Sequence, residues 1–266
     1  MIKISLAQFE VQVGKPEVNF HTAVKFIEHA AAQHSSIILL PELWTSGYDL
    51  SNWTAYISPN QNILGEIIQL SKKHQIAIGG SYITADEQGC RNTFIIAKSD
   101  GTLSTPYHKV HLFRLLEEHQ FFQAGDRFVI EQFEWGKAGL AICYDLRFPE
   151  MFRFHAKNGA SMVLIVAQWG ARRAEHWRTF LKARAIENQI FVAGVNAIGR
   201  VGNTLNAGYS AVVSPWGEVL IEGAPDHEEL LSAEIDFNLI KEVKQHLNSA
   251  QDRRDDLYKK WFDQSA

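Results

Sequence analysis

The sequence predicts a layered α/β fold with one mixed sheet or a pair of sheets. Strand and helix patterns alternate at both ends of the chain, and hairpin patterns lie between them. Two strand segments, residues 36–40 and 162–167, are almost entirely apolar, which is typical of strands buried on both faces. No repeat, low-complexity linker or change of composition divides the 266 residues. We therefore expect one domain spanning residues 1–266.

The first half of the chain carries clear periodic patterns. Residues 2–9 largely alternate apolar and polar side chains and predict a strand. Apolar side chains at helical spacing predict helices over residues 16–33 and 63–74, and residues 76–83 predict a strand. Residues 92–107 surround an Asp-Gly pair, which favours a tight turn and therefore a hairpin.

The second half continues the alternation. Its predicted elements are strands at 127–133 and 137–142, a helix at 148–157, a strand at 162–167, a helix at 173–188, a strand at 190–196, a hairpin at 209–222, a strand at 230–235 and a helix at 237–246. The tail, residues 251–266, is polar but contains Leu257, Tyr258, Trp261 and Phe262. A solvated tail does not need four large apolar side chains, so we expect it to dock on its own or a partner subunit.

Composition excludes several classes of function. The chain is 46% hydrophobic and 21% charged with a net charge of −4, and it has no run of Lys or Arg, so no nucleic-acid partner is expected. Two cysteines, Cys90 and Cys143, are too few for a disulfide framework and favour a reducing compartment. No signal-peptide pattern and no apolar run of about 18 residues is present, so we expect a cytoplasmic protein without membrane contact.

Three chemically capable side chains each follow a predicted strand or hairpin. Glu42 follows residues 36–40, Lys109 follows the 92–107 hairpin, and Cys143 follows residues 137–142. Ligand sites in α/β folds gather at such strand ends. Singly, Glu42 could cap a helix, Lys109 could be a solvated charge and Cys143 a small buried hydrophobe. The position of Cys143, just before a helix N-terminus, favours a thiolate.

The segments around these residues resemble a known family. Leu40–Leu43, His108–Phe113 and Cys143–Glu150 are similar, in order and separation, to the three signature segments of the nitrilase, or carbon–nitrogen hydrolase, superfamily. The resemblance implies a four-layer α-β-β-α sandwich of two packed, mixed sheets with helices outside. It also implies a homodimer paired through helices, or a higher homo-oligomer.

The resemblance also implies roles for the site residues. It identifies Cys143 as the nucleophile, Glu42 as the general base and Lys109 as an electrostatic stabiliser. Glu118 falls where many members carry a second carboxylate near the cysteine. Glu117 is the alternative for that position, and Glu118 could instead be an ordinary surface charge. The backbone N–H of Tyr144 would join Lys109 in holding an oxyanion.

The expected chemistry uses neither a metal nor an organic cofactor. His108, His111 and His119 hint at a metal cluster, but no second group of ligands with matching spacing follows, and Lys109 would repel a cation. A Cys–His pair of the protease type is improbable beside the Glu and Lys pattern.

Two further segments bear on the substrate. Residues 111–125 and 168–177 resemble those of bacterial omega-amidases, which hydrolyse the terminal amide of 2-oxoglutaramate, and often 2-oxosuccinamate, to ammonia and a 2-oxo dicarboxylate. Arg173 matches an arginine of those enzymes and would suit the carboxylate of a 2-oxo acid, or else it pairs on its helix; Arg172 is the alternative. Trp169 would line the pocket wall, or else belongs to the core. Gln168 stands where asparagine is expected.

Two competing hypotheses remain. The same chemistry could act on N-carbamoyl compounds, short aliphatic amides or nitriles, although nitrilases tend to carry tryptophan where Tyr144 stands. A non-catalytic scaffold is the other hypothesis, and it has no use for Glu42, Lys109 and Cys143 together.

Overall fold

Two six-stranded mixed sheets form the centre of the molecule. The computed structural model describes residues 1–87 and 89–264, with side chains through residue 260. The first sheet has the order β14-β1-β2-β3-β4-β5, formed by Glu229–Ile235, Ile2–Gln8, Ile37–Leu39, Ala77–Asp86, Gly89–Ala97 and Tyr107–His108. The second has the order β13-β12-β9-β8-β7-β6, formed by Val219–Glu222, Ala211–Val213, Phe191–Asn196, Met162–Ala167, Gly136–Ile142 and Ile130–Phe133.

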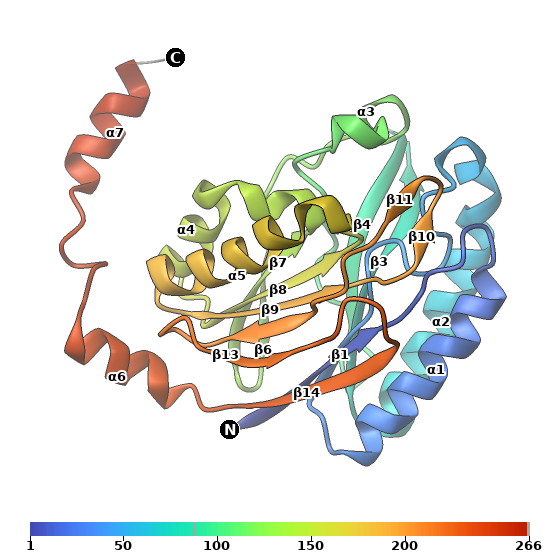
Figure 1. The fold of residues 1–266 in the computed structure, drawn as a ribbon, viewed down its shortest axis with the longest axis horizontal. Helices are drawn as coiled ribbons and strands as arrows, with labels where there is room; N and C mark the ends of the chain where they lie inside the picture. Colours follow the sequence, from blue (N-terminus) through green and yellow to red (C-terminus); the bar gives the residue numbers. More distant parts are fainter. Residues whose placement is uncertain (88, 265–266) are drawn as a thin grey trace.

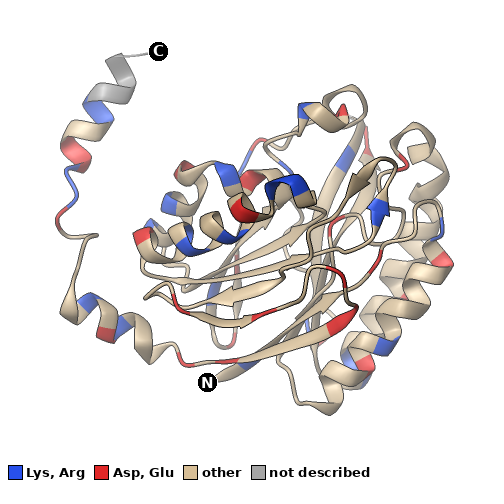
Figure 2. Ribbon diagram, in the orientation of Figure 1, with Lys and Arg blue, Asp and Glu red and all other residues tan. Residues whose placement is uncertain are grey.

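Helices cover the outer face of each sheet (Figure 1). Helices α1 (Pro16–Ala32) and α2 (Ile57–His74) lie on the first sheet, and α4 (Pro149–Lys157) and α5 (Ala174–Asn188) on the second. Helix α5 carries both acidic and basic residues (Figure 2). The remaining short elements are η1 (Leu50–Tyr56), η2 (Arg114–Leu116), α3 (Glu118–Phe121), η3 (Cys143–Arg147), η4 (Ala171–Arg173), β10 (Arg200–Val201), β11 (Thr204–Leu205), α6 (Asn238–His246) and α7 (Asp255–Gln264).

Strand alternation explains the layers. Successive side chains of a strand point to opposite faces. Ile37 and Leu39 of β2 therefore enter the core between the sheets, together with residues of β7 and β8. Ile38 and Leu40 instead pack with Ile27 of α1 and other residues of α1 and α2. A strand buried on both faces has to be apolar throughout, which is why this segment was predictable. The predicted α-β-β-α sandwich is confirmed.

The parallel strands fix where their ends meet. In the first sheet β1, β2 and β3 run parallel, and in the second β7, β8 and β9 do. The end of β2 reaches the end of β8, where the N–H of Glu42 donates to the carbonyl of Ala167 at 3.5 Å. Segments that follow strands in both sheets are thereby brought to one edge of the sandwich.

The structure differs from the local predictions at one helix start and adds features that were not predicted. Helix α2 begins at Ile57 rather than residue 63 because Pro59 is tolerated in a first turn. The predicted hairpin over residues 92–107 is present: β4 pairs antiparallel with β5, and the Ala97–Leu103 bridge closes the Asp-Gly turn. The pairing of β4 with β3 on its other side was not predicted. The short helix α3 and the β10–β11 pair had no sequence signal.

The chain beyond β14 leaves the sandwich. Helices α6 and α7 lie to one side of it (Figure 1), and Lys157 of α4 contacts Asp255 at 2.6 Å. The side chains of Trp261 and Phe262 fall outside the described residues, so docking of the tail stays a prediction. None of the described helices has the length and hydropathy of a membrane span.

Candidate active site

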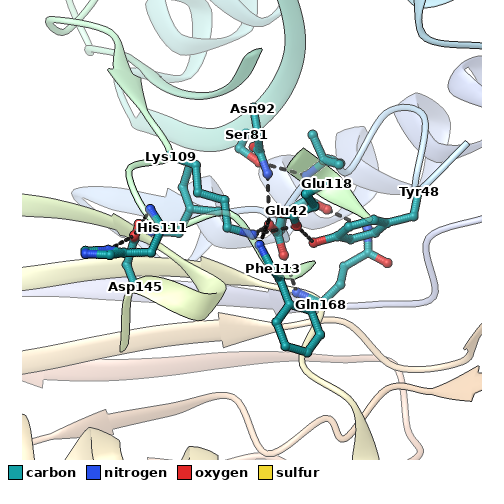
Figure 3. Close-up of polar contacts among 12 residues, drawn as sticks. Glu42, Tyr48, Ser81, Asn92, Lys109, His111, Phe113, Glu118, Asp145 and Gln168 are labelled. Carbon is teal, nitrogen blue, oxygen red and sulfur yellow. Dashed lines mark hydrogen bonds and ion pairs between the residues drawn. The ribbon is translucent and has the colours of Figure 1, made fainter. Parts of the chain in front are cut away.

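Glu42 and Lys109 meet at the edge where β2 and β5 end (Figure 3). Cys143, at the end of β7, lies beside both of them. The exposed fractions of Glu42, Lys109 and Cys143 are 0%, 1% and 6%. Lys109 donates to Oε1 of Glu42 and to Oε1 of Glu118, each at 2.7 Å. Burial lowers the pKa of Lys109, but the two carboxylates outweigh it and the pKa is raised overall. Lys109 is therefore a charged ammonium between two acids.

Glu42 is held by donors from three segments of the chain. Besides Lys109, Asn92 of β4 donates to its Oε1 at 2.8 Å, and the backbone N–H of Gln168 donates to its Oε2 at 3.0 Å. The side-chain amide of Gln168 donates to the main-chain oxygen of Glu42 at 2.7 Å. Leu43 has a φ of 45°, a strained value for a non-glycine residue. The carboxylate orientation is thus fixed by its surroundings.

Glu118 is the buried member of its pair, and Glu117 is exposed. Its Oε1 accepts the hydroxyl of Tyr48 at 2.8 Å, and its Oε2 accepts the N–H of Phe113 at 2.8 Å. Burial raises the pKa of Glu118, opposed chiefly by the charge of Lys109. The left-handed φ of 57° at Glu117 begins α3 and turns the next side chain inward.

Cys143 is a protonated thiol at rest, which corrects the thiolate expectation. Burial raises its pKa well above the usual range, and the negative charge of Glu42 adds to this while Lys109 opposes it. A helix N-terminus favours a thiolate, but burial of the thiol, aided by the charge of Glu42, outweighs that effect. The φ of Cys143 is 45°, a strained conformation of the kind that collects at functional sites.

Asp145 anchors the turn that carries the thiol. It accepts the N–H of Ile142 at 2.9 Å and the hydroxyl of Tyr107 at 2.7 Å. It also contacts the ring nitrogen Nδ1 of His111 at 2.7 Å. His111 therefore supports the turn after β7. Among the described residues, no three His, Cys, Asp or Glu side chains are grouped to hold a metal ion.

A small cavity opens beside the thiol. It is lined by Tyr48, Phe113, Leu116, Cys143, Tyr144, Arg147, Gln168, Trp169, Gly170 and Arg173. Trp169 and Arg173 thus line the same cavity as Cys143, whereas Arg172 is exposed and lies outside the lining. The backbone N–H of Tyr144 belongs to the first turn of η3, where such groups lack intrahelical partners.

Sequence reasoning missed the second arginine of this cavity. The guanidinium of Arg147 lies 4.8 Å from the ring centroid of Trp169, and that of Arg173 lies 5.2 Å from the centroid of Phe113. Within the described part of the chain, neither arginine pairs with an acidic side chain. Burial lowers the pKa of Arg147. Burying a cation that has no acidic partner is energetically costly. The only sequence signal that could have singled out Arg147 is its position four residues after Cys143.

A larger hollow of about 790 Å³ lies at the opposite end of the strands. It is bordered by Ser36, Ala77, Lys98 and Trp135, near the starts of β2 and β3. None of the buried ionised side chains around Cys143 lines this hollow, so the size of a cavity does not by itself identify the active site.

Comparisons with known proteins agree with this geometry. The carbon-nitrogen hydrolase family profile matches residues 3–245. A 2-oxoglutaramate amidase of Bacillus subtilis is 38% identical, with 96% of this chain and 98% of the relative covered. The omega-amidase NIT2 of Xenopus tropicalis is 32% identical, with 96% of each covered. The crystal structure of XC1258 from Xanthomonas campestris, a CN-hydrolase superfamily protein with an arsenic adduct in its active site, superposes with a TM-score of 0.87. It is 32% identical, over 95% of this chain and 97% of that one.

Proposed function

Because the chain belongs to the carbon-nitrogen hydrolase family, we propose that it is an omega-amidase that hydrolyses the terminal amide of 2-oxoglutaramate. The products are ammonia and 2-oxoglutarate, and 2-oxosuccinamate, one methylene shorter, is the second substrate. One observation carries this proposal: a small cavity joins Cys143 and a buried acid–base cluster to two arginines that pair with no acidic side chain among the described residues. The names of the relatives support the same substrate class.

The first step forms a tetrahedral intermediate. Cys143 is a thiol at rest, so Glu42 takes its proton as sulfur attacks the amide carbon. The carbonyl electron pair moves to oxygen, and the oxyanion is held by the ammonium of Lys109 and the N–H of Tyr144. A donor placed in this way contributes about 3–4 kcal/mol to the transition state.

The second step requires an acid. A thiolate leaves more readily than an amide anion, so the intermediate reverts unless its nitrogen is protonated. Glu42 now carries the proton and gives it to that nitrogen, whereupon the C–N bond breaks and ammonia departs. Glu42 then takes a proton from water as the water oxygen attacks the thioester. It returns that proton to the departing sulfur, which releases the acid and restores the thiol. Glu118 keeps Lys109 in place throughout.

The two arginines select the substrate. Arg147 and Arg173 bind the carboxylate of the 2-oxo acid, because a guanidinium presents paired donors to a carboxylate. The packing of Arg147 on Trp169 fixes its plane. A neutral amide gains nothing from either cation.

Ammonia release from 2-oxoglutaramate, with Cys143→Ala as the inactive control, tests the reaction. Arg147→Ala and Arg173→Ala should each raise KM for this substrate by about 10-fold or more and leave a neutral amide nearly unaffected. Arg172→Ala is the matched comparison, because Arg172 lies outside the cavity. Equal effects on both substrates would contradict the carboxylate role. Turnover of a carbamoyl compound in place of 2-oxoglutaramate would favour the competing substrate class, and no turnover of any amide would favour the scaffold.

We also propose that the chain is a single-domain cytoplasmic protein and assembles as a homodimer or larger homo-oligomer, with the tail on its own or a partner subunit. Exposed apolar side chains on α4 and α5, Phe154 and Ile186, support self-association, and the two free buried cysteines suit a reducing compartment. Light scattering of the full chain tests the assembly, and a monomer at micromolar concentration would contradict it.

A further inference from the structure

Tyr48 is a buried phenol between the acid cluster and the cavity. Its hydroxyl donates to Glu118 Oε1 at 2.8 Å, and its side chain lines the cavity that contains Cys143. Figure 3 shows the ring directed at Glu118 and Glu42. Because the single hydroxyl proton is used toward Glu118, the lone pairs of the phenol oxygen remain available as acceptors. Burial and the neighbouring carboxylates raise the pKa of Tyr48, so the phenol stays protonated.

Gln168 supplies a second acceptor at the same cavity. Its Nε2 donates to the main-chain oxygen of Glu42, which fixes the orientation of the side-chain amide. Its Oε1 is buried and has no donor among the described residues. A buried carbonyl oxygen without a donor is costly and calls for a partner. Tyr48 and Gln168 thus line the cavity together with Cys143.

We propose that Tyr48 and Gln168 bind the leaving NH₂ group of the substrate, the phenol oxygen accepting one N–H and Gln168 Oε1 the other. This inference rests on the amidase reaction proposed above, but not on the identity of the acid. A primary carboxamide has two N–H donors, whereas a nitrile and an ester have none. The two residues thereby select carboxamides over other acyl compounds.

The same contacts orient the nitrogen for protonation. Attack by Cys143 makes the nitrogen pyramidal and gives it a localised lone pair. If Tyr48 and Gln168 hold the two N–H bonds, that lone pair is left to face Glu42. Once Glu42 has donated its proton, the nitrogen is cationic and both contacts become charge-assisted. The contacts are thus stronger near the transition state than in the bound substrate and act on catalysis.

The test compares an amide with its ester in the same variants. kcat/KM is measured for native protein, Tyr48→Phe and Gln168→Met with 2-oxoglutaramate and with the 5-methyl ester of 2-oxoglutarate, which has no N–H. In both variants the amide value should fall by about 10- to 100-fold more than the ester value. Gln168→Met also loses the contact to the Glu42 main chain, which affects both substrates alike. Because each ratio is taken within one variant, partial unfolding cancels.

Tyr82→Phe is the matched control. It removes another buried tyrosine hydroxyl, next to Trp44 and away from the cavity of Cys143, and should leave the amide-to-ester ratio unchanged. An equal fall for amide and ester in Tyr48→Phe would overturn the proposal and reduce Tyr48 to a support of Glu118. If native protein fails on 2-oxoglutaramate, the substrate proposal fails instead, and the ratio is measured with the primary amide it does hydrolyse and the matching ester.

Discussion

Replacing Lys109 with methionine removes the ammonium that joins the two buried carboxylates. The side chains of Glu42, Lys109 and Glu118 are all fully buried, and both N···O distances are 2.7 Å. Methionine has a similar length and is apolar, so the change removes charge with little change of volume. What remains is a pair of acids facing each other across an apolar side chain.

The expected cost follows from this geometry. Breaking a buried ion pair by removing one partner costs about 3–5 kcal/mol. The upper part of that range applies, because one ammonium serves two acids. Asn92 and Tyr48 still donate to the carboxylates and offset part of the loss. Activity should also disappear, because Lys109 is the proposed oxyanion partner.

The loss of folding stability in Lys109→Met should depend on pH. Burial already raises the pKa of Glu118 with Lys109 present, and without the opposing ammonium it rises further. An acid whose pKa is higher in the folded than in the unfolded protein contributes stability below its unfolded pKa, about 4.3, and loses it as pH rises through the folded pKa. The destabilisation of Lys109→Met should therefore be smaller at pH 5 than at pH 8.

Urea unfolding at several pH values measures this. The control is Lys25→Met, an exposed lysine on α1 that should change the free energy of unfolding by less than about 0.5 kcal/mol. A loss below about 1 kcal/mol in Lys109→Met, equal at pH 5 and pH 8, would refute the buried-charge reasoning.

Two other substitutions test the electrostatics of the site and the core. Glu42→Gln should lower amide hydrolysis by about 100-fold or more yet lower the pKa of Cys143, because the charge of Glu42 helps to raise it; an unchanged thiolate absorbance titration would contradict this. Burial lowers the pKa of His155 to about 4, so the unfolded chain binds its proton first as pH falls from about 6.5, and native protein loses roughly 3 kcal/mol by pH 4. His155→Leu should flatten this part of the unfolding profile, and equal slopes for the two proteins would contradict the assignment.

The strands of the interior were predictable because burial on both faces leaves no choice of side chain. Residues 162–167 were predicted as a strand, and β8 spans Met162–Ala167. The β3–β4 pairing was not predicted, because an Asp-Gly turn is a local signal whereas partners in a sheet are chosen by tertiary packing. Helix α3 has four residues, too few for any periodicity to appear.

In the site, too, residues with a local sequence signal could be predicted and residues placed only by tertiary packing could not. Glu42, Lys109 and Cys143 each follow a strand or hairpin, so their convergence could be expected from parallel strands ending at one edge. Asn92 lies 50 residues from Glu42 in sequence, and no local pattern marks it as a donor. The thiolate expectation was wrong for a related reason. It weighed the helix that follows Cys143 and could not weigh burial or a carboxylate from another sheet.

The charge of the cluster explains why a protonated thiol suits the proposed mechanism. Two carboxylates and one ammonium already leave one net negative charge in a buried site, so a free thiolate would add a second. Moving the thiol proton to Glu42 keeps the total unchanged. The nucleophile can therefore form only together with protonated Glu42, which is the acid that must later expel ammonia. Burial, which raises the pKa of Cys143, thereby couples attack on the carbonyl to the protonation that makes the attack productive.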